Sequence, residues 1–446
     1  MKHIEEPARR TPVLAETDVL VVGGGPGGLS AALGAARAGA KTLLVERYGC
    51  FGGVIAQCMI GTIAWYRTNE KTVDAGGIGV EFERRAKSMN ASLEVNRYQV
   101  LDTEIFKHIA DEMIQEAGIV PLLHTQVVDV VLDGRTIRGV VTESKSGRGA
   151  ILARRVIDAT GDADVAARAG APFRIDPKAE LEPVSVNFGC SGVNLPALIE
   201  YMQKHPSSVA DWGDRSGDKE AAEVSTFLRK PFDLAKQAGE IPADVRMESY
   251  WGSLTDAGEI PSLNAIHMAG IDSTDVWDLT RAEIEGRRQV LWAVAALKKY
   301  QPGFEKARLR TMGASLGCRE SRKILGDYDL TGDDVLHQAR FEDSIGIFPE
   351  FLDGNRIAIM PSTGRYFHVP YRITLPQRVE NLSVAGRCVA GDKVSHAATR
   401  QMMCCTVTGQ GAGVAAAVSL EDDVTVREVD VSHVQRVLAA QGVRLA

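Results

Sequence analysis

Short apolar runs separated by glycine-rich stretches characterise the N-terminal part of the chain. Residues 18–22, DVLVV, form a β-branched run that predicts a buried strand. Residues 27–38 are rich in alanine and other small residues, which predicts a helix packed closely on a sheet, and Gly39 suits its C-terminal stop. Residues 41–46, KTLLVE, predict a second buried strand. This succession predicts a βαβ unit in which the two strands are parallel.

Further along, two turn signals predict antiparallel structure. The runs VVDVVL and IRGVVT flank Asp133-Gly134, a dipeptide typical of hairpin turns. A second turn at residues 146–149 leads into AILARRVIDATG. We therefore expect an antiparallel meander and an apolar strand that ends at residues 158–161.

Three later segments also have clear patterns. Residues 281–300 predict the clearest amphipathic helix of the chain. Residues 381–387, NLSVAGR, predict a buried strand that ends in glycine, and residues 406–420 predict a small-residue helix with glycines at its start. The pattern loosens in the middle of the chain, so we expect three parts: residues 1–170, 171–363 and 364–446.

The composition places the chain among ordinary globular proteins. Of its 446 residues, 45% are hydrophobic and 24% are charged, which excludes the disordered, collagen-like and disulfide-scaffold classes. A net charge of −7 provides no general electrostatic reason to bind nucleic acid or an anionic membrane. No apolar run reaches the roughly 18 residues of a membrane span, and the N-terminus lacks a signal-peptide pattern.

The cysteines point to a reducing compartment. There are seven, an odd number, in a long chain without a CxxC motif. The same spacing provides no zinc or iron–sulfur ligand set. We therefore expect a cytoplasmic protein without a metal site.

The glycines after the first predicted strand match a dinucleotide-binding pattern, Gly23-x-Gly25-x-x-Gly28. The first glycine allows the tight turn, the second lets the backbone approach a pyrophosphate, and the third lets helix and strand pack closely. Glu46 ends the next strand 18 residues after Gly28, where its carboxylate can accept a hydrogen bond from a ribose hydroxyl. A carboxylate in this position disfavours a 2′-phosphate, so NADP is disfavoured. The alternative is a phosphate-free unit whose glycines serve packing alone. The motif does not distinguish FAD from NAD.

Longer motifs resemble one family. VVGGGPGGLSAALGAARAGAKTLLVERYGCFGG resembles the N-terminal motif of FAD-dependent oxidoreductases with a glutathione-reductase-like FAD domain, in which a Gly-Gly pair, here Gly52-Gly53, lies beside the FAD. VIDATGDADVA resembles the strand that returns to the nucleotide site. LGCRESRKILGDYDLTGDDV and the stretch from FHVPYRITLP to GQGAGVAAA are similar to the distal motifs of a bacterial subgroup of largely unassigned substrate. The resemblance spans about residues 18–420.

The resemblance implies an α/β fold. Residues 1–170 and 364–446 would form the glutathione-reductase-like FAD-binding Rossmann domain with its β-meander, and residues 171–363 a second, α+β substrate or cap domain. The implied cofactor is noncovalent FAD. The residues implied to bind it are Gly23, Gly25, Gly27, Gly28, Glu46, Arg47, Gly52, Gly53, Val127, Thr160, Gly161, Asp162, Gly386, Arg387, Asp392, Gly409, Gln410 and Gly411.

The C-terminal glycines allow two interpretations. In the family, a helix N-terminus meets the flavin ring, and a helix dipole aimed at the pyrimidine edge would stabilise negative charge on reduced flavin. Gly409, Gln410, Gly411 and Gly413 match that element. The alternative is small-residue packing against the sheet.

Two absent features narrow the chemistry. Disulfide reductases carry Cys-x4-Cys just after the Gly-Gly pair, whereas this chain has VIAQC at residues 54–58. A second GxGxxG in a βαβ context is also missing, which disfavours a dedicated NAD(P)H domain. Electrons would then pass between substrate and flavin, and on to O2, a quinone or a protein acceptor.

Four residues are candidates for catalysis or substrate contact. His396 and His368 stand in or beside the C-terminal motifs and could manage a proton, although each could equally be a structural histidine. Arg400 and Arg319 could each clamp a carboxylate or stabilise an oxyanion, since a guanidinium binds carboxylates in a fork geometry. An internal ion pair with Glu320 is the alternative for Arg319.

Other side chains are weaker candidates. Tyr366 and Tyr371 could carry protons but fit aromatic core better, and Cys404-Cys405 fit two small buried hydrophobes better than a redox pair. Cys50 stands near the expected flavin and could attach it covalently. The last group, which could line the substrate side, is Trp65, Tyr66 and Arg67.

The sequence therefore predicts an FAD-dependent oxidoreductase, a dehydrogenase or oxidase, acting on a small organic molecule. One alternative is a flavin monooxygenase of the aromatic hydroxylase kind, which uses NAD(P)H and O2 without a second nucleotide domain. The other is a non-catalytic FAD-binding protein. A homo-oligomer is compatible with the sequence, which does not identify the substrate.

Overall fold

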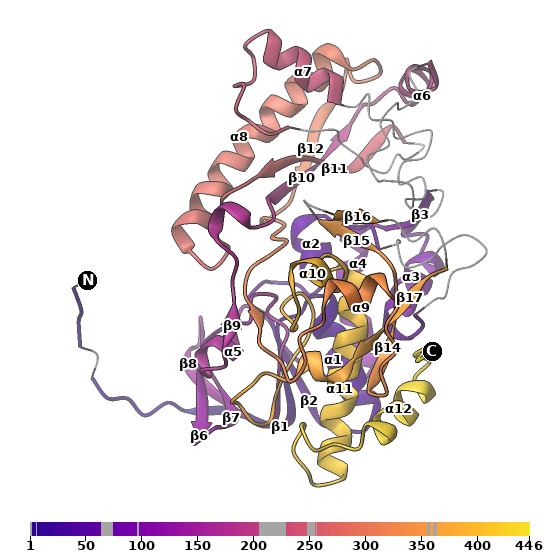
Figure 1. The fold of residues 1–446 in the computed structure, drawn as a ribbon. Helices are drawn as coiled ribbons and strands as arrows, with labels where there is room; N and C mark the ends of the chain where they lie inside the picture. Colours follow the sequence, from indigo (N-terminus) through magenta and orange to yellow (C-terminus); the bar gives the residue numbers. More distant parts are fainter. Residues whose placement is uncertain are drawn as a thin grey trace.

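The computed structural model has two parts that lie one above the other in Figure 1. It describes residues 2–5, 7–63, 75–95, 98–204, 229–247, 255, 257–354, 357–359 and 364–446. The lower part contains the main sheet and both chain termini, and the upper part contains a smaller sheet and a long helix.

A seven-stranded sheet forms the centre of the lower part, in the order β5-β2-β1-β8-β7-β6, with β18 paired to β8. Parallel pairing joins β1 (Val13–Val22) to β2 (Thr42–Val45) and to β8 (Gly147–Asp158). The outer parallel strands are β5 (Val120–Leu122) and β18 (Leu382–Val384). The predicted parallel βαβ unit is confirmed.

The predicted meander is also confirmed. Strands β6 (Gln126–Asp133), β7 (Thr136–Ser144) and β8 pair antiparallel in succession. The first turn contains Gly134, whose φ of +60° lies in the left-handed region that glycine adopts without strain. Because β8 also lies parallel beside β1, a single strand connects the meander to the nucleotide-binding unit.

Two small-residue helices, α1 (Pro26–Arg37) and α11 (Met402–Glu421), pack directly on one another. A Cβ added at Gly409 or Gly413 would lie 2.0 Å from the backbone oxygen of Gly27 or Ala31, respectively. The prediction that glycines begin this helix is wrong, because α11 starts at Met402 and its glycines lie inside it. The packing interpretation accounts for them.

By length and composition α11 would also suit a membrane span, the only such helix among the described residues. However, 94% of its apolar stretch is buried inside the protein, as in a core helix. Every residue of the helix from 403 to 419 is buried.

The upper part has a separate hydrophobic core. Strands β11 (Glu259–Met268), β10 (Val184–Ser191) and β12 (Arg308–Met312) form an antiparallel sheet, which α8 (Val276–Tyr300) covers. Helix α7 (Lys230–Gln237) packs on α8. Helix α8 begins before the predicted residue 281, because the Asp275 carboxylate caps it by accepting from the Trp277 N–H at 2.7 Å. The chain rejoins the lower core at Ile324, and the three-part division of the chain stays a prediction.

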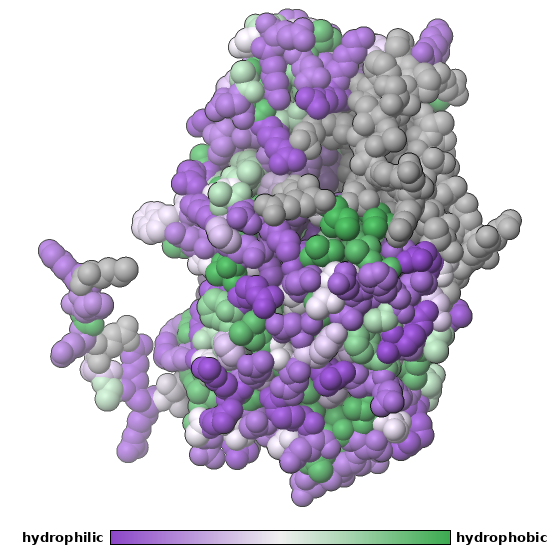
Figure 2. All heavy atoms as spheres, in the orientation of Figure 1, coloured by the Kyte–Doolittle hydropathy of each residue, from purple (hydrophilic) through white to green (hydrophobic). Residues whose placement is uncertain are grey.

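The remaining elements complete both parts. They are α2 (Val54–Cys58), α3 (Gly77–Ser88), β3 (Ser92–Val95), β4 (Tyr98–Leu101), α4 (Thr103–Glu116), α5 (Asp164–Arg168), β9 (Phe173–Arg174), η1 (Lys178–Glu180), α6 (Leu195–Lys204), β13 (Lys323–Ile324), α9 (Gly332–Leu336), β14 (Ser344–Pro349), β15 (Leu352–Gly354), β16 (Ile357–Ile359), β17 (Tyr366–Pro370), η3 (Tyr371–Thr374), α10 (Lys393–Thr399) and α12 (Val431–Ala440). In the face shown in Figure 2, hydrophilic residues cover most of the described surface.

Candidate active site

A cavity of about 450 Å³ lies at the carboxyl ends of the parallel strands, where the two parts of the molecule meet. Its wall includes Val22, Val45 and Ala385 at the ends of strands β1, β2 and β18. The upper part contributes Asn264 of β11 and Glu283 of α8. Ligands of open α/β sheets bind outside the carboxyl ends of the strands, so this position is the expected one.

The glycine loop and the start of α1 form one wall of the cavity. Gly23 has a φ of +101°, and a Cβ there would lie 2.4 Å from the Ala159 carbonyl oxygen, so only glycine fits. Gly25, Pro26 and Gly27 line the cavity, and no side chain caps the helix. The first-turn N–H groups of α1 therefore remain available to an anion, whose charge the helix dipole favours.

Glu46 lies in the wall beside this helix end. Its buried carboxylate accepts from the Gly24 N–H at 2.7 Å and from the Tyr48 N–H at 3.0 Å. These two bonds hold the side chain at the end of β2, in the position that the sequence predicts for a ribose contact. Arg47 and Val127, also predicted to contact the cofactor, line the same cavity.

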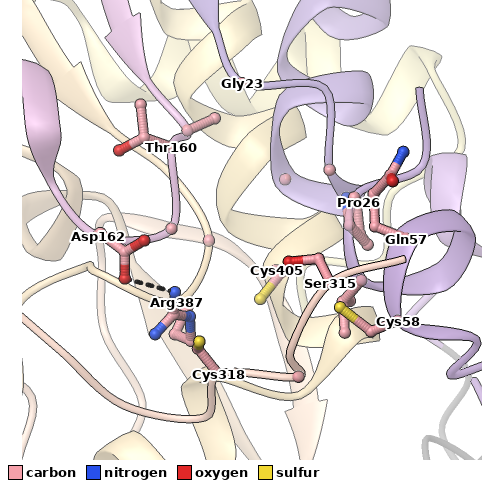
Figure 3. A pocket seen from close by; sticks show the side chains of 18 of the residues that line it. Gly23, Pro26, Gln57, Cys58, Thr160, Asp162, Ser315, Cys318, Arg387 and Cys405 are labelled. Carbon is pink, nitrogen blue, oxygen red and sulfur yellow. Dashed lines mark hydrogen bonds and ion pairs between the residues drawn. The ribbon is translucent and has the colours of Figure 1, made fainter. Parts of the chain in front are cut away.

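The loop after β8 forms the opposite wall, and Thr160, Gly161 and Asp162 all line the cavity (Figure 3). Asp158 anchors this loop by accepting from the Thr160 hydroxyl at 2.7 Å and from the Ala166 N–H at 2.8 Å. Its carboxyl is fully buried, and burial raises its pKa.

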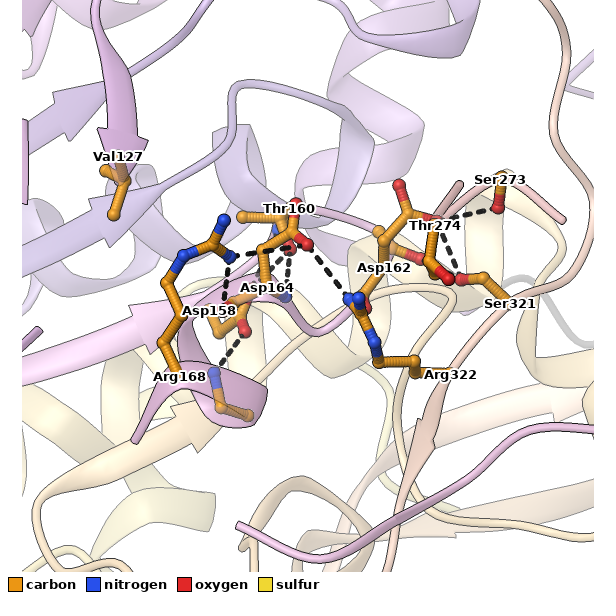
Figure 4. A network of polar contacts seen from close by, with 12 residues as sticks. Val127, Asp158, Thr160, Asp162, Asp164, Arg168, Ser273, Thr274, Ser321 and Arg322 are labelled. Atoms are coloured by element: carbon orange, nitrogen blue, oxygen red, sulfur yellow. Dashed lines mark hydrogen bonds and ion pairs between the residues drawn. The ribbon is translucent and has the colours of Figure 1, made fainter. Parts of the chain in front are cut away.

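Asp162 is the centre of a polar network that joins the two parts of the molecule (Figure 4). Its carboxylate accepts from the Ser321 hydroxyl at 2.6 Å, from the Ser273 hydroxyl at 3.3 Å and from the Arg387 guanidinium at 2.7 Å. Burial alone would raise the pKa of Asp162, but Arg387 and Ser321 hold it below its usual value. Arg322 adds a bond to the Asp162 carbonyl oxygen at 2.9 Å.

The structure separates the predicted cofactor residues into two groups. Those that line the cavity are Gly23, Gly25, Gly27, Glu46, Arg47, Gly53, Val127, Thr160, Gly161, Asp162, Gly386 and Arg387. Those outside its lining are Gly28, Gly52, Asp392, Gly409, Gln410 and Gly411.

Residues in the second group have other structural partners. The Asp392 carboxylate caps α10 by accepting from the Ser395 N–H at 2.7 Å. The Gln410 side chain accepts from the Ile78 N–H and donates to Gln441, both at 3.0 Å. The part of α11 that lines the cavity is its N-terminus, through Gln401, Met402 and Cys405, rather than its glycines.

Neither candidate histidine lines the cavity. His396 is buried, and its Nε2 donates to the Arg319 carbonyl oxygen at 3.1 Å. In His368, Nδ1 accepts from the Phe341 N–H at 3.1 Å. Burial lowers the pKa of both imidazoles, that of His396 well below its usual value. The geometry favours the structural alternative for both.

Both candidate arginines line the cavity. Arg319 donates to the Pro183 carbonyl oxygen at 2.7 Å, and Arg400 donates to the Asp353 carbonyl oxygen. Burial and the nearby Arg400 lower the pKa of Arg319 to about 10. The suggested pairing of Arg319 with Glu320 is wrong, because Glu320 bonds Lys323 and Lys393 at 2.6 and 2.8 Å.

Three thiols that the sequence reasoning did not single out for the cavity reach its wall: Cys58, Cys318 and Cys405 (Figure 3). Burial raises the pKa of Cys318 to about 11 and that of Cys405 to about 12. Cys318 belongs to the LGCRES motif, a signal that could have identified it. All seven cysteines are free.

The weaker candidates lie elsewhere. Cys50 is outside the cavity lining, and its sulfur accepts from the Gln57 amide at 3.0 Å. Tyr371 is buried in the core and donates to the Val426 carbonyl oxygen at 2.6 Å. Cys404 is a buried core residue, and Tyr366 lies over His368. Outside the described residues are Trp65, Tyr66 and Arg67.

Comparison with known proteins completes the description of the site. Residues 18–438 match the model of a family described as "FAD dependent oxidoreductase". A geranylgeranyl bacteriochlorophyll reductase-like protein of Thermoplasma acidophilum is 14% identical at a TM-score of 0.47, covering 96% of this chain and 82% of that one. A p-nitrophenol 4-monooxygenase of Pseudomonas putida is 11% identical at a TM-score of 0.46, covering 96% of this chain and 85% of that one. An L-proline dehydrogenase of P. horikoshii is 12% identical at a TM-score of 0.42, covering 98% of this chain and 100% of that one.

Proposed function

This chain belongs to the FAD-dependent oxidoreductase family, and on that premise we propose that it is a dehydrogenase or oxidase of a small organic molecule. Electrons pass between the substrate and bound FAD, and then to O2, a quinone or a protein acceptor. The reaction uses neither a redox-active disulfide nor a dedicated NAD(P)H domain.

One observation carries this proposal: a single cavity is lined by the nucleotide-binding loop and by residues of the upper part. Gly25 and Glu46 belong to the first set, and Asn264 and Arg319 to the second. A cofactor held by the first set would share its cavity with a molecule that contacts the second. This arrangement supports direct transfer between substrate and flavin.

The residues present fit FAD. The uncapped N-terminus of α1 suits a pyrophosphate, and the Glu46 carboxylate suits a ribose hydroxyl. A Cβ at Gly53 would lie 2.6 Å from the Gly25 Cα, so these glycines keep the loops close and the cradle open. The buried Asn264 Oδ1 has no partner among the described residues, as expected of a wall that meets a ligand.

The chain itself contributes binding, orientation and electrostatics. When bound, FAD supplies the capacity to accept and donate a hydride or single electrons. The N-terminus of α11 lines the cavity, and its N–H groups and dipole favour negative charge beside it. Tyr48 also lines the cavity, and its hydroxyl donates to the Ser315 hydroxyl at 3.1 Å.

Two features of the described residues accord with a reaction that uses neither a redox-active disulfide nor a dedicated NAD(P)H domain. Every parallel strand pairing within the described residues belongs to the one seven-stranded sheet, so that part of the chain holds no second βαβ nucleotide fold. Cys58 donates to the Leu316 carbonyl oxygen at 3.1 Å, and its thiol is free.

Spectroscopy of the purified protein tests the proposal. Flavin absorbance bands, released as FAD into the supernatant on acid precipitation, are expected for noncovalent binding. A panel of small organic molecules is then mixed with the holoprotein under anaerobic conditions, and bleaching of the flavin without NAD(P)H is the supporting result. NAD(P)H consumption with O2 uptake that depends on an aromatic substrate would establish the monooxygenase alternative. A flavin that neither substrates nor reductants reduce would establish the non-catalytic one.

A further inference from the structure

Arg319 and Arg400 line the same cavity and have few hydrogen-bond partners among the described residues. Arg319, which follows β12, donates one hydrogen bond to the Pro183 carbonyl oxygen, its only hydrogen-bond partner among the described residues. A guanidinium has five N–H donors, so Arg319 retains most of its bonding capacity. Its positive charge is largely withdrawn from water, a costly arrangement unless an anion compensates it.

Arg400, at the end of α10, lines the same cavity. It donates to the Asp353 carbonyl oxygen, and the Asp353 carboxylate lies 3.6 Å away. The Arg400 Nε is buried and has no partner among the described residues. Arg319 and Arg400 are close enough to repel one another, which contributes to the low pKa of Arg319.

Two nearby acids are bonded to other cations. Glu320 is bonded to Lys323 and Lys393, and Asp162 to Arg387. Of the two acids that act on Arg319, Asp353 lines the cavity and Glu182 does not. The wall nevertheless keeps several guanidinium N–H groups of Arg319 and Arg400 without a partner among the described residues.

We propose that Arg319 and Arg400 together bind a carboxylate of the substrate, so that this enzyme oxidises or reduces a carboxylate-bearing small molecule. The inference rests on the proposed function and specifies its substrate class. A carboxylate matches the planar fork of a guanidinium and forms charge-assisted hydrogen bonds with its free N–H groups. A neutral substrate would offer these N–H donors no charged acceptor.

Ligand titration of the FAD-loaded protein tests the inference without turnover. The probes are propionate and benzoate, with propionamide and benzamide as neutral counterparts of the same shape. Binding is followed by the visible absorbance of the bound flavin and by calorimetry. The carboxylates are expected to bind at least about tenfold more tightly than the amides, since charge-assisted hydrogen bonds are the stronger ones.

Variants identify the groups responsible. Arg319→Met and Arg400→Met are expected to weaken carboxylate binding about tenfold or more while keeping the FAD content, and Arg319→Lys to weaken it less. Arg288→Met is the matched control, because Arg288 pairs with Glu285 on the exposed face of α8. This variant should bind carboxylates with the affinity of the wild-type protein. If the methionine variants do not fold, the inference is tested by the carboxylate affinity of Arg319→Lys and by the difference in affinity between acids and amides for the wild-type protein.

Three outcomes would overturn the inference. These are equal affinity for acids and amides, tighter binding of inorganic phosphate than of carboxylates, and loss of FAD from the methionine variants, which would assign the arginines to the cofactor. Failure of the proposed function is distinguishable from these. If only the proposed function fails, carboxylates bind through both arginines but no substrate reduces the flavin. If neutral substrates alone reduce the flavin, the proposed function holds and only the assignment of a carboxylate-bearing substrate is refuted.

Discussion

The Arg387 guanidinium donates to the Asp162 carboxylate at 2.7 Å, and both side chains line the same cavity. Asp162 follows β8 and Arg387 follows β18, neighbouring strands that are far apart in the sequence. The pair is mostly buried, so each charge depends on the other for compensation. It therefore fixes the two loops that enclose the predicted flavin site.

Replacing Asp162 by Asn should destabilise the protein and weaken FAD binding. The change leaves Arg387 buried without an anion, and the expected loss in the free energy of unfolding is about 3 kcal/mol. Urea unfolding and FAD titration of the apoprotein measure the two effects. The exposed Asp133, paired with Arg138 at 3.4 Å, provides the control Asp133→Asn, which should change stability by less than about 0.5 kcal/mol.

The same pair has a defined acid dependence. The pKa of Asp162 is below its usual value in the folded protein, so its stabilisation is present above the unfolded-state value of about 3.9 and is lost as pH falls through the folded value. The stability gap between wild type and Asp162→Asn should therefore narrow on acidification below about pH 4. A gap that widens there would contradict this assignment.

Gly409→Ala should disrupt the contact between α1 and α11. The new Cβ would lie 2.0 Å from the Gly27 carbonyl oxygen, and both atoms belong to helix backbones that cannot shift independently. We expect a loss of about 3 kcal/mol in the free energy of unfolding, measured by chemical denaturation. The Cβ of Gly34→Ala would lie 3.0 Å from the Gln410 carbonyl oxygen, so this substitution should lower the free energy of unfolding by less. Equal effects of the two substitutions would argue against close backbone packing as the cause.

Buried His396 should make the protein less stable in mild acid. Its folded-state pKa is well below the unfolded value of about 6.5, so its contribution is present above that pH and is lost as the unfolded chain takes up a proton below it. The expected slope is up to about 1.4 kcal/mol per pH unit between pH 6 and 5. His396→Gln, whose amide can still donate to Arg319, should remove this slope, whereas His108→Gln at an exposed position should keep it.

Cys318 should react slowly with iodoacetamide at neutral pH. Its pKa of about 11 leaves little thiolate at pH 7, and the rate should rise up to tenfold per pH unit as the pH approaches that value. Mass spectrometry of the alkylated peptide measures the rate, with N-acetylcysteine as the reference thiol. Bound FAD should slow it further, because Cys318 lines the cavity. Reaction of Cys318 as fast as the reference at pH 7 would contradict the buried-thiol assignment.

Local structure was predictable wherever near neighbours in the sequence determine it. The glycine loop from Gly23 to Gly28, the parallel strands on either side of it and the hairpin at Asp133-Gly134 all follow from short-range patterns. Backbone conformation at Gly23 and Gly134 depends on the absence of a Cβ, a property of the residue itself. Glu46 reaches the cavity because it ends a strand whose direction the βαβ unit determines.

The start of α11 was not predictable in this way. The helix is buried along almost its whole length, so its residues carry no polar face from which to read a boundary. Gly409 and Gly413 are required by the approach of α1, which lies far earlier in the chain, and Gly411 by the approach of Ile345 in β14. A glycine at a helix start and a glycine at a helix contact look alike in a sequence.

By itself, the sequence determined the nucleotide-binding unit and the family, because these depend on contiguous motifs. Only the tertiary structure decided which distant side chains share the cavity. It placed His396 against the Arg319 carbonyl, paired Glu320 with Lys393, and brought Cys58, Cys318 and Cys405 to the same cavity. The physical reason is that a side chain's partners depend on how separate elements pack, and packing is set by the summed contacts of the whole core rather than by neighbours in the chain.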